Sequence, residues 1–184
     1  GSKVNFSDQL LSRSDILSDQ TAFICCSETF GRKELSWRDL QTQTASVAGA
    51  FRDMGLSKGD RVVAILPNTE VALVALLACA SLGAIWSICA PDMGHAAIID
   101  RFCQIKPKIL IAQDGYVHAG KTIDRSQTIG IIWAALESVQ HLVLVPVVGE
   151  IGQSDINWHD LTEKEVKFYP IPVAFDHPLW IVYS

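Results

Sequence analysis

The fold class is decided by residues 61–70, which read RVVAILPNTE. The run Arg61–Leu66 is almost wholly apolar and rich in β-branched side chains, which is typical of a strand buried on both faces. Pro67 ends the strand, and we predict that Asn68 caps a helix whose positive end suits Glu70. This strand–loop–helix unit favours a parallel sheet that is covered by helices.

Apolar segments of strand length and helix length alternate on both sides of this unit. Before it, we predict a helix that begins at Ser36, has Asp39 at its third position and ends at Gly55. The other predicted elements are strands at Thr21–Ser27, Ile85–Ile88, Lys108–Ala112 and His141–Val147, and helices at Ala96–Gln104 and Ser126–Ser138. This order implies right-handed crossovers, so we predict an α/β fold with a largely parallel sheet and flanking helices.

The composition fits one folded domain in a reducing compartment. A chain of 184 residues with 49% hydrophobic side chains is long enough to bury a core. The net charge of −5 argues against a general nucleic-acid binder, which normally carries a basic face. The five cysteines include no CxxC pair, so we expect reduced thiols, a cytoplasmic location and no metal site. Residues 1–2, Gly-Ser, are interpreted as a cloning remnant.

An uncharged stretch from Val71 to Pro91 is long enough to raise the question of a membrane span. Gly83 interrupts it, and its flanks are Glu70 and Asp92 instead of basic anchors. A buried helix followed by a buried strand has the same composition, so we predict no membrane insertion. Separately, Trp86 and Trp133 are expected to be core aromatic residues, and Cys103 is expected to be a buried cysteine of a helix.

Ligands of parallel α/β sheets bind beyond the carboxyl ends of the strands, which points to three loops. These are Pro67–Glu70, Cys89–His95 and Gln113–Thr122. The third contains Gly115–Thr122, GYVHAGKT, which satisfies the phosphate-loop pattern G-x-x-x-x-G-K-[ST]. In that interpretation Lys121 would contact phosphate and Thr122 would hold magnesium.

Two features weaken the phosphate-loop hypothesis. We expect no apolar strand to run into the Asp that would hold the magnesium, and residues 123–127 show no clear helical stripe. A small P-loop nucleotide hydrolase that uses Gly115–Thr122 therefore remains one alternative, and a surface turn with a solvated lysine is another. A third alternative is a non-catalytic folding or interaction module.

Several longer stretches carry a resemblance to a known family. They are Gly59-Asp60-Arg61-Val62-Val63, Leu66-Pro67-Asn68, Ala80–Ser87, Pro91-Asp92-Met93-Gly94, Asp100-Arg101-Phe102, Gln104-Ile105, Pro107-Lys108, Asp114-Gly115-Tyr116, Gly120-Lys121 and Asp124-Arg125. With these residues the chain resembles the acetoacetyl-CoA synthetases, within the adenylate-forming acyl-CoA ligases. The resemblance implies a ligase that forms an acyl-adenylate from acetoacetate and ATP with Mg²⁺, and then transfers the acyl group to coenzyme A.

The resemblance also implies a coenzyme A site in two segments. His118, Ala119, Gly120 and Lys121 match an Arg-Ala-Gly-Arg segment that contacts coenzyme A near its 3′-phosphate in acetyl-CoA synthetases. Asp92-Met93-Gly94 match a loop that borders the pantetheine path. No catalytic residue is assigned within this chain.

The resemblance finally implies a domain assignment for residues 3–184. They correspond to the N-terminal part of the adenylation domain, and Leu179–Ser184 match the strand that leads into the ATP phosphate loop. The ATP site then lies mostly beyond Ser184, the C-terminal domain is absent, and the chain alone is expected to be inactive. An apolar face left exposed in this way would favour self-association.

Overall fold

A computed structural model describes residues 1–149 and 156–183 of the chain. Short helices and strands follow one another in the order set out here: β1 (Lys3–Val4), α1 (Phe6–Leu11), β2 (Thr21–Ser27), β3 (Gly31–Ser36), α2 (Trp37–Asp53), β4 (Arg61–Ile65), α3 (Glu70–Ser81), β5 (Ile85–Cys89), α4 (His95–Ile105), β6 (Ile109–Gln113), β7 (Gly115–His118), β8 (Lys121–Asp124), α5 (Ser126–Ala135), β9 (His141–Val145), β10 (Ile156–Asn157), α6 (Trp158–Thr162) and β11 (Val173–Ala174). The predicted α/β class is confirmed.

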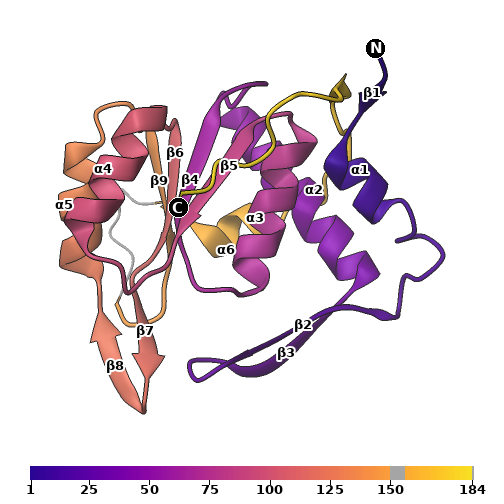
Figure 1. Ribbon diagram of the computed structural model, residues 1–184. Helices are drawn as coiled ribbons and strands as arrows, with labels where there is room; N and C mark the ends of the chain where they lie inside the picture. The colour runs from indigo at the N-terminus through magenta and orange to yellow at the C-terminus, as the bar shows by residue number, and fades with distance from the viewer. Residues whose placement is uncertain (150–155, 184) are drawn as a thin grey trace.

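The main sheet has five strands in the order β10-β9-β6-β4-β5, and every neighbouring pair is parallel. Three two-stranded antiparallel sheets accompany it, formed by β1 with β11, β2 with β3 and β7 with β8. In Figure 1 the β7–β8 hairpin projects downwards from the main sheet, and the β2–β3 hairpin runs across the lower part of the view below α2 and α3.

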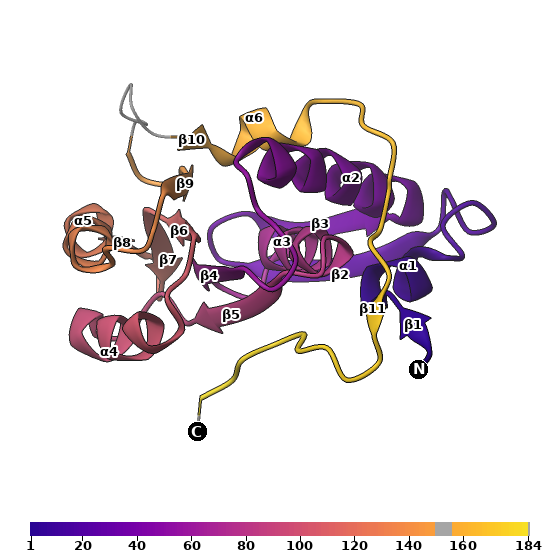
Figure 2. The same ribbon diagram turned by 90° about the horizontal axis from the view of Figure 1, so that it is seen from above.

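Alternate residues of each central strand point to opposite faces of the sheet, and each face has its own core. Val62 and Ala64 pack in a cluster with residues of α2, α3 and α6. Val63 and Ile65 pack in a second cluster with residues of α4 and α5. Figure 2 shows these two helical layers on either side of the sheet. Because both faces of β4 are buried, its apolar residues are continuous in the sequence.

The helix starts follow the prediction at one site and depart from it at another. At α2, the Asp39 N–H donates to Ser36 Oγ (3.1 Å), which confirms the predicted cap. At α3, the residue before the helix is Thr69 and not Asn68, and Thr69 makes no side-chain capping bond. The Thr69 N–H donates to the Pro67 carbonyl (2.8 Å), and this tight turn moves the helix start by one residue.

The predicted burial of two side chains, one in α4 and one in α5, is wrong. Trp86 is 1% exposed and lies in the core as predicted, but Trp133 is 41% exposed and Cys103 is also exposed. Each follows a fully buried residue, Ile132 or Phe102. Since successive helix residues are turned by about 100°, a neighbour of a buried residue faces away from the core.

Other differences lie towards the C-terminus. Helix α5 ends at Ala135 instead of Ser138, and β9 ends at Val145. The short elements β10 and α6 have no counterpart in the prediction, although Trp158 and Leu161 bury α6 against the first core. Within residues 1–149 and 156–183, no helix has both the length and the apolar character that a membrane crossing requires.

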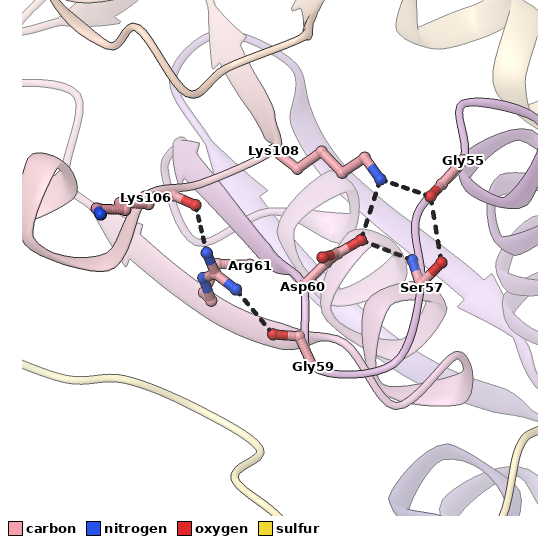
Figure 3. Close-up of polar contacts among 7 residues, drawn as sticks. All are labelled: Gly55, Ser57, Gly59, Asp60, Arg61, Lys106 and Lys108. Carbon is pink, nitrogen blue, oxygen red and sulfur yellow. Dashed lines mark hydrogen bonds and ion pairs between the residues drawn. The ribbon is translucent and has the colours of Figure 1, made fainter.

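A polar network at the amino ends of β4 and β6 contains Gly55, Ser57, Gly59, Asp60, Arg61, Lys106 and Lys108 (Figure 3). The Arg61 guanidinium donates to the carbonyl oxygens of Gly59 (3.0 Å), Ile105 (2.5 Å) and Lys106 (2.7 Å). Two of these oxygens belong to the end of α4, where Lys106 is left-handed (φ 49°). Arg61 therefore caps the helix that precedes β6.

Lys108 and Asp60 form the other half of this amino-edge network (Figure 3). Lys108 Nζ donates to the Gly55 carbonyl (2.7 Å) and pairs with Asp60 Oδ2 (3.2 Å). The same Asp60 oxygen accepts the Ser57 N–H (2.9 Å). The network joins the end of α2 to two strands of the sheet, at the edge opposite to that where ligands bind in such folds.

Candidate functional site

The three loops selected from the sequence leave the same edge of the sheet. Strands β4, β5 and β6 are parallel, with Ile65 opposite both Cys89 and Ala112. The residues that follow these positions therefore emerge together beyond the carboxyl ends. This confirms that the three loops lie at the same edge of the sheet.

The phosphate-loop pattern belongs to a β-hairpin. β7 and β8 pair in antiparallel register with His118 opposite Lys121. Between them, Ala119 (φ 50°) and Gly120 (φ 72°) are both left-handed, as a tight two-residue hairpin turn requires. Lys121 lies in a strand, and α5 begins only at Ser126. The P-loop interpretation is wrong, because no helix N-terminus follows the lysine to meet a phosphate.

The first glycine of the pattern has a packing role at the base of this hairpin. A Cβ atom on Gly115 would lie 2.6 Å from the Ile123 carbonyl oxygen and 2.7 Å from a methyl group of Val148. The close approach of the two strands therefore needs a residue without a side chain. This requirement explains why a glycine stands at the position that mimics a phosphate loop.

Asp114 is a residue whose role the sequence did not reveal. β6 runs through Gln113 directly into Asp114, an acidic residue at the carboxyl end of a central strand. Asp114 is 7% exposed. Its Oδ1 accepts the Val147 N–H (2.7 Å) and its Oδ2 accepts the Gly149 N–H (2.8 Å). Both oxygens hold the loop after β9, which is a structural use of the carboxylate.

The segment Asp92–Gly94 is tied to the base of the β7–β8 hairpin. Arg125 Nη2 donates to the Met93 carbonyl (2.8 Å), and Arg101 Nη1 contacts Met93 Sδ (3.0 Å). Gly94 precedes α4 without a side-chain cap, and Asp92 is exposed. The sequence contains both arginines in the stretches that carry the family resemblance, but gives no sign that they converge on one methionine.

The structure does not gather the two predicted coenzyme A segments into one cluster. His118 and Lys121 are exposed at the tip of the hairpin, and Met93 contacts Arg125 at its base. A three-residue step along β8 separates Lys121 from Asp124, which is about 10 Å of strand. The two segments therefore lie at opposite ends of the hairpin, an arrangement suited to an elongated ligand.

A second hairpin contacts this tip. The turn between β2 and β3 places Glu28 Oε2 3.1 Å from the Gly120 nitrogen, and Thr29 Oγ1 accepts the Val117 N–H (3.2 Å). The N–H groups of Gly120 and Ala119 hold the pKa of the Glu28 carboxyl below its usual range, with a smaller contribution from His118. Figure 1 shows the β2–β3 turn pointing towards β7–β8. No sequence pattern signals this contact.

The C-terminal segment lies beside β5, but it forms only an isolated parallel bridge between Trp180 and Trp86 and not the strand expected at Leu179–Ser184. The Trp86 N–H donates to the Leu179 carbonyl (3.0 Å), and the Ile181 N–H donates to the Trp86 carbonyl (2.8 Å). Tyr183 Oη donates to the Arg101 carbonyl (2.7 Å), and burial raises the pKa of Tyr183. Ser184 lies outside the described residues.

Hollows in the described surface lie mainly away from the hairpin tip. A groove of about 580 Å³ follows α2 beside residues 165–168. A more apolar one of about 320 Å³ lies between α1 and the β11 region, and a cavity of about 190 Å³ is bordered by Thr69 and Trp180. Among the described residues, no group of three or more His, Cys, Asp or Glu is placed to hold a metal ion.

Comparison with known proteins identifies the family. The family model described as "AMP-binding enzyme" matches residues 14–184. The chain belongs to the AMP-binding enzyme family. Among its curated relatives is the acetoacetyl-CoA synthetase of Mus musculus, 34% identical over 201 residues, which cover 100% of this chain and 29% of the relative. The acetoacetyl-coenzyme A synthetase of Rhizobium meliloti (strain 1021) is 32% identical over 190 residues, which cover 99% of this chain and 28% of the relative.

The fold of this AMP-binding chain is also that of a solved relative. The structure titled "Acetoacetyl-CoA Synthetase from Streptomyces lividans" matches with a TM-score of 0.96 and 36% identity. The match covers 100% of this chain and 29% of that one. This AMP-binding chain thus spans less than a third of the length of the relatives it resembles, and its described fold is one portion of theirs.

Proposed function

We propose that this chain is part of an acid–thiol ligase of the acetoacetyl-CoA synthetase type. Such an enzyme converts acetoacetate, ATP and coenzyme A into acetoacetyl-CoA, AMP and diphosphate through an acyl-adenylate. The observation that carries the proposal is the similarity to proteins of that name, which extends along the whole chain at 34% identity in the mouse relative and 36% in the solved one.

The adenylate-forming half of the reaction uses ATP and Mg²⁺, and we infer that residues outside this chain bind them. The chain spans 29% of its relatives' length. Asp114 is the acidic residue that directly follows a central strand, and both of its oxygens already accept backbone N–H groups. Asp114 therefore does not fit a magnesium ligand, and the 184-residue chain is expected to release no diphosphate by itself.

We propose that residues of this chain form part of the binding site for coenzyme A. Lys121 places an ammonium group, and His118 an imidazole, on the two sides of an exposed turn. A phosphate monoester at this tip would gain a point charge from Lys121. Towards the base, Asp92, Met93 and Gly94 would border the pantetheine arm, and Arg125 fixes their position through the Met93 carbonyl.

The test is a comparison of coenzyme A with dephospho-coenzyme A, which lacks the 3′-phosphate. We expect the chain to bind coenzyme A more tightly, and Lys121→Met to remove about fivefold of that preference in Kd. Lys164→Met, at an exposed lysine beside α6, is the matched control and should keep it. Equal binding of the two ligands by the unmodified chain, or tight binding of MgATP in their place, would contradict the assignment.

We also propose a cytoplasmic location and self-association of the isolated chain. All five cysteines are free thiols, which fits a reducing compartment. Phe175 and Val182 near the C-terminus are 82% and 76% exposed, and Trp180 is also exposed. These side chains would associate with those of a second copy, so light scattering should give a mass that rises with concentration.

A further inference from the structure

The turn at the tip of the β7–β8 hairpin already holds an anionic group. Its residues Ala119 and Gly120 are both left-handed, which leaves their backbone N–H groups free of the hairpin ladder. Consecutive N–H groups in such a conformation form a concave donor site for anions. The Gly120 N–H donates to Glu28 Oε2 at 3.1 Å, so a carboxylate of this chain occupies the site.

The position of Glu28 does not depend on this one bond. The neighbouring Thr29 accepts the Val117 N–H (3.2 Å), and the rest of the β2–β3 hairpin is paired from Ser27 with Gly31 onwards. Glu28 is exposed, so its side chain is free to rotate away while Thr29 keeps the two hairpins in contact. The carboxylate can therefore leave the turn without separating the hairpins.

We propose that Glu28 is a specificity-determining residue that competes with phosphate for the N–H groups of the hairpin turn. This inference rests on the proposed function, in which His118 and Lys121 receive the 3′-phosphate of coenzyme A. A phosphate between these two side chains reaches the Gly120 N–H only when the Glu28 carboxylate has moved aside. Glu28 thereby lowers the affinity for phosphate and leaves that for dephospho-ligands unaffected.

The charges indicate that Glu28 competes with phosphate and does not assist its binding. A carboxylate and a phosphate monoester are both anions and need the same donors. The backbone N–H groups hold the pKa of Glu28 below its usual range, so the residue is ionised at neutral pH when the ligand arrives. Lys121 supplies the opposing charge on the same turn, and the balance between it and Glu28 sets how strongly phosphate binds.

The experiment uses Glu28→Gln and Glu28→Ala in the 184-residue chain, with binding measured by calorimetry. Glu137→Gln, an exposed residue after α5, is the control for the change in net charge. We expect both Glu28 variants to bind coenzyme A about threefold to fivefold more tightly at low salt, with dephospho-coenzyme A unchanged. Where the unmodified chain prefers coenzyme A to dephospho-coenzyme A, unchanged or weaker binding of coenzyme A in correctly folded variants would overturn the inference.

A second measurement separates this inference from the proposed function. Inorganic phosphate is titrated while the amide resonance of Gly120 is followed by NMR. If phosphate shifts this resonance at lower concentrations in Glu28→Gln than in the unmodified chain, the competition is real. That result stands even if coenzyme A shows no preference over dephospho-coenzyme A, in which case the proposed function alone fails. Identical phosphate titrations in both proteins would disprove the competition.

Discussion

Replacement of Arg61 by Met tests whether the amino-edge network is structural. The substitution removes three hydrogen bonds and keeps an apolar stem of similar length. The bonds to Gly59 and Ile105 are partly buried, whereas the bond to Lys106 is exposed. Water replaces the exposed bond at little cost, but the other two carbonyl oxygens lose a charged donor.

The expected loss of stability follows from these two bonds. A hydrogen bond to a charged group contributes about 1.5–3 kcal/mol, and the freed side chain recovers part of that through rotamer entropy. We therefore expect Arg61→Met to lower the free energy of unfolding by about 2–4 kcal/mol. Arg52→Met is the control, because Arg52 is exposed in the last turn of α2, and it should change stability by less than about 0.5 kcal/mol.

Urea unfolding followed by tryptophan fluorescence gives both values, with the fully buried Trp86 as a reporter. The reasoning fails if Arg61→Met and Arg52→Met are equally stable. It also fails if Arg61→Met keeps its stability but loses coenzyme A binding, since that outcome would place a ligand contact at the wrong edge of the sheet.

Three further predictions concern the core, the hairpin and pH. Phe102→Ala, at a fully buried site, should cost about 3–5 kcal/mol in urea unfolding. Gly115→Ala should cost at least about 2 kcal/mol because a backbone oxygen lies 2.6 Å from the new Cβ, whereas Gly130→Ala has open space in α5 and should be neutral or stabilising. Burial alone would raise the pKa of Glu70, but hydrogen bonds from Lys33 and a buried thiol hold it below 4.5. Its stabilising effect should be complete above pH 4.5 and decline as the pH falls below that value, and urea midpoints of Glu70→Gln should lack this decline.

The sheet was predictable because strands that are buried on both faces have continuous apolar sequences. Val62–Leu66 is apolar throughout, and that continuity indicates that both faces of the strand are covered. The short elements β10 and α6 were not predictable, because two or five residues show no period. Trp158 and Leu161 anchor α6 in the first core, but two apolar residues alone do not mark a helix in the sequence.

The residues of the candidate site could be selected from the sequence, but their arrangement in space could not. The stretch Gly115–Thr122 has the spacing of a phosphate loop, yet its strand pairing makes it a hairpin. A sequence motif describes only the spacing of residue types. Whether a helix or a second strand contains Lys121 depends on contacts with residues that are distant in the sequence. The Glu28 contact is of the same kind, since 92 positions separate it from Gly120.

The amino-edge network has a consequence for how such proteins diverge. Lys108 pairs with Asp60, and the remaining polar contacts of these two residues and of Arg61 are with nearby backbone groups. None of these contacts requires a ligand. Mutations at the hairpin tip can accumulate without disturbing them. A match at residues 59–61 in another protein therefore indicates shared architecture and carries no information about its ligand.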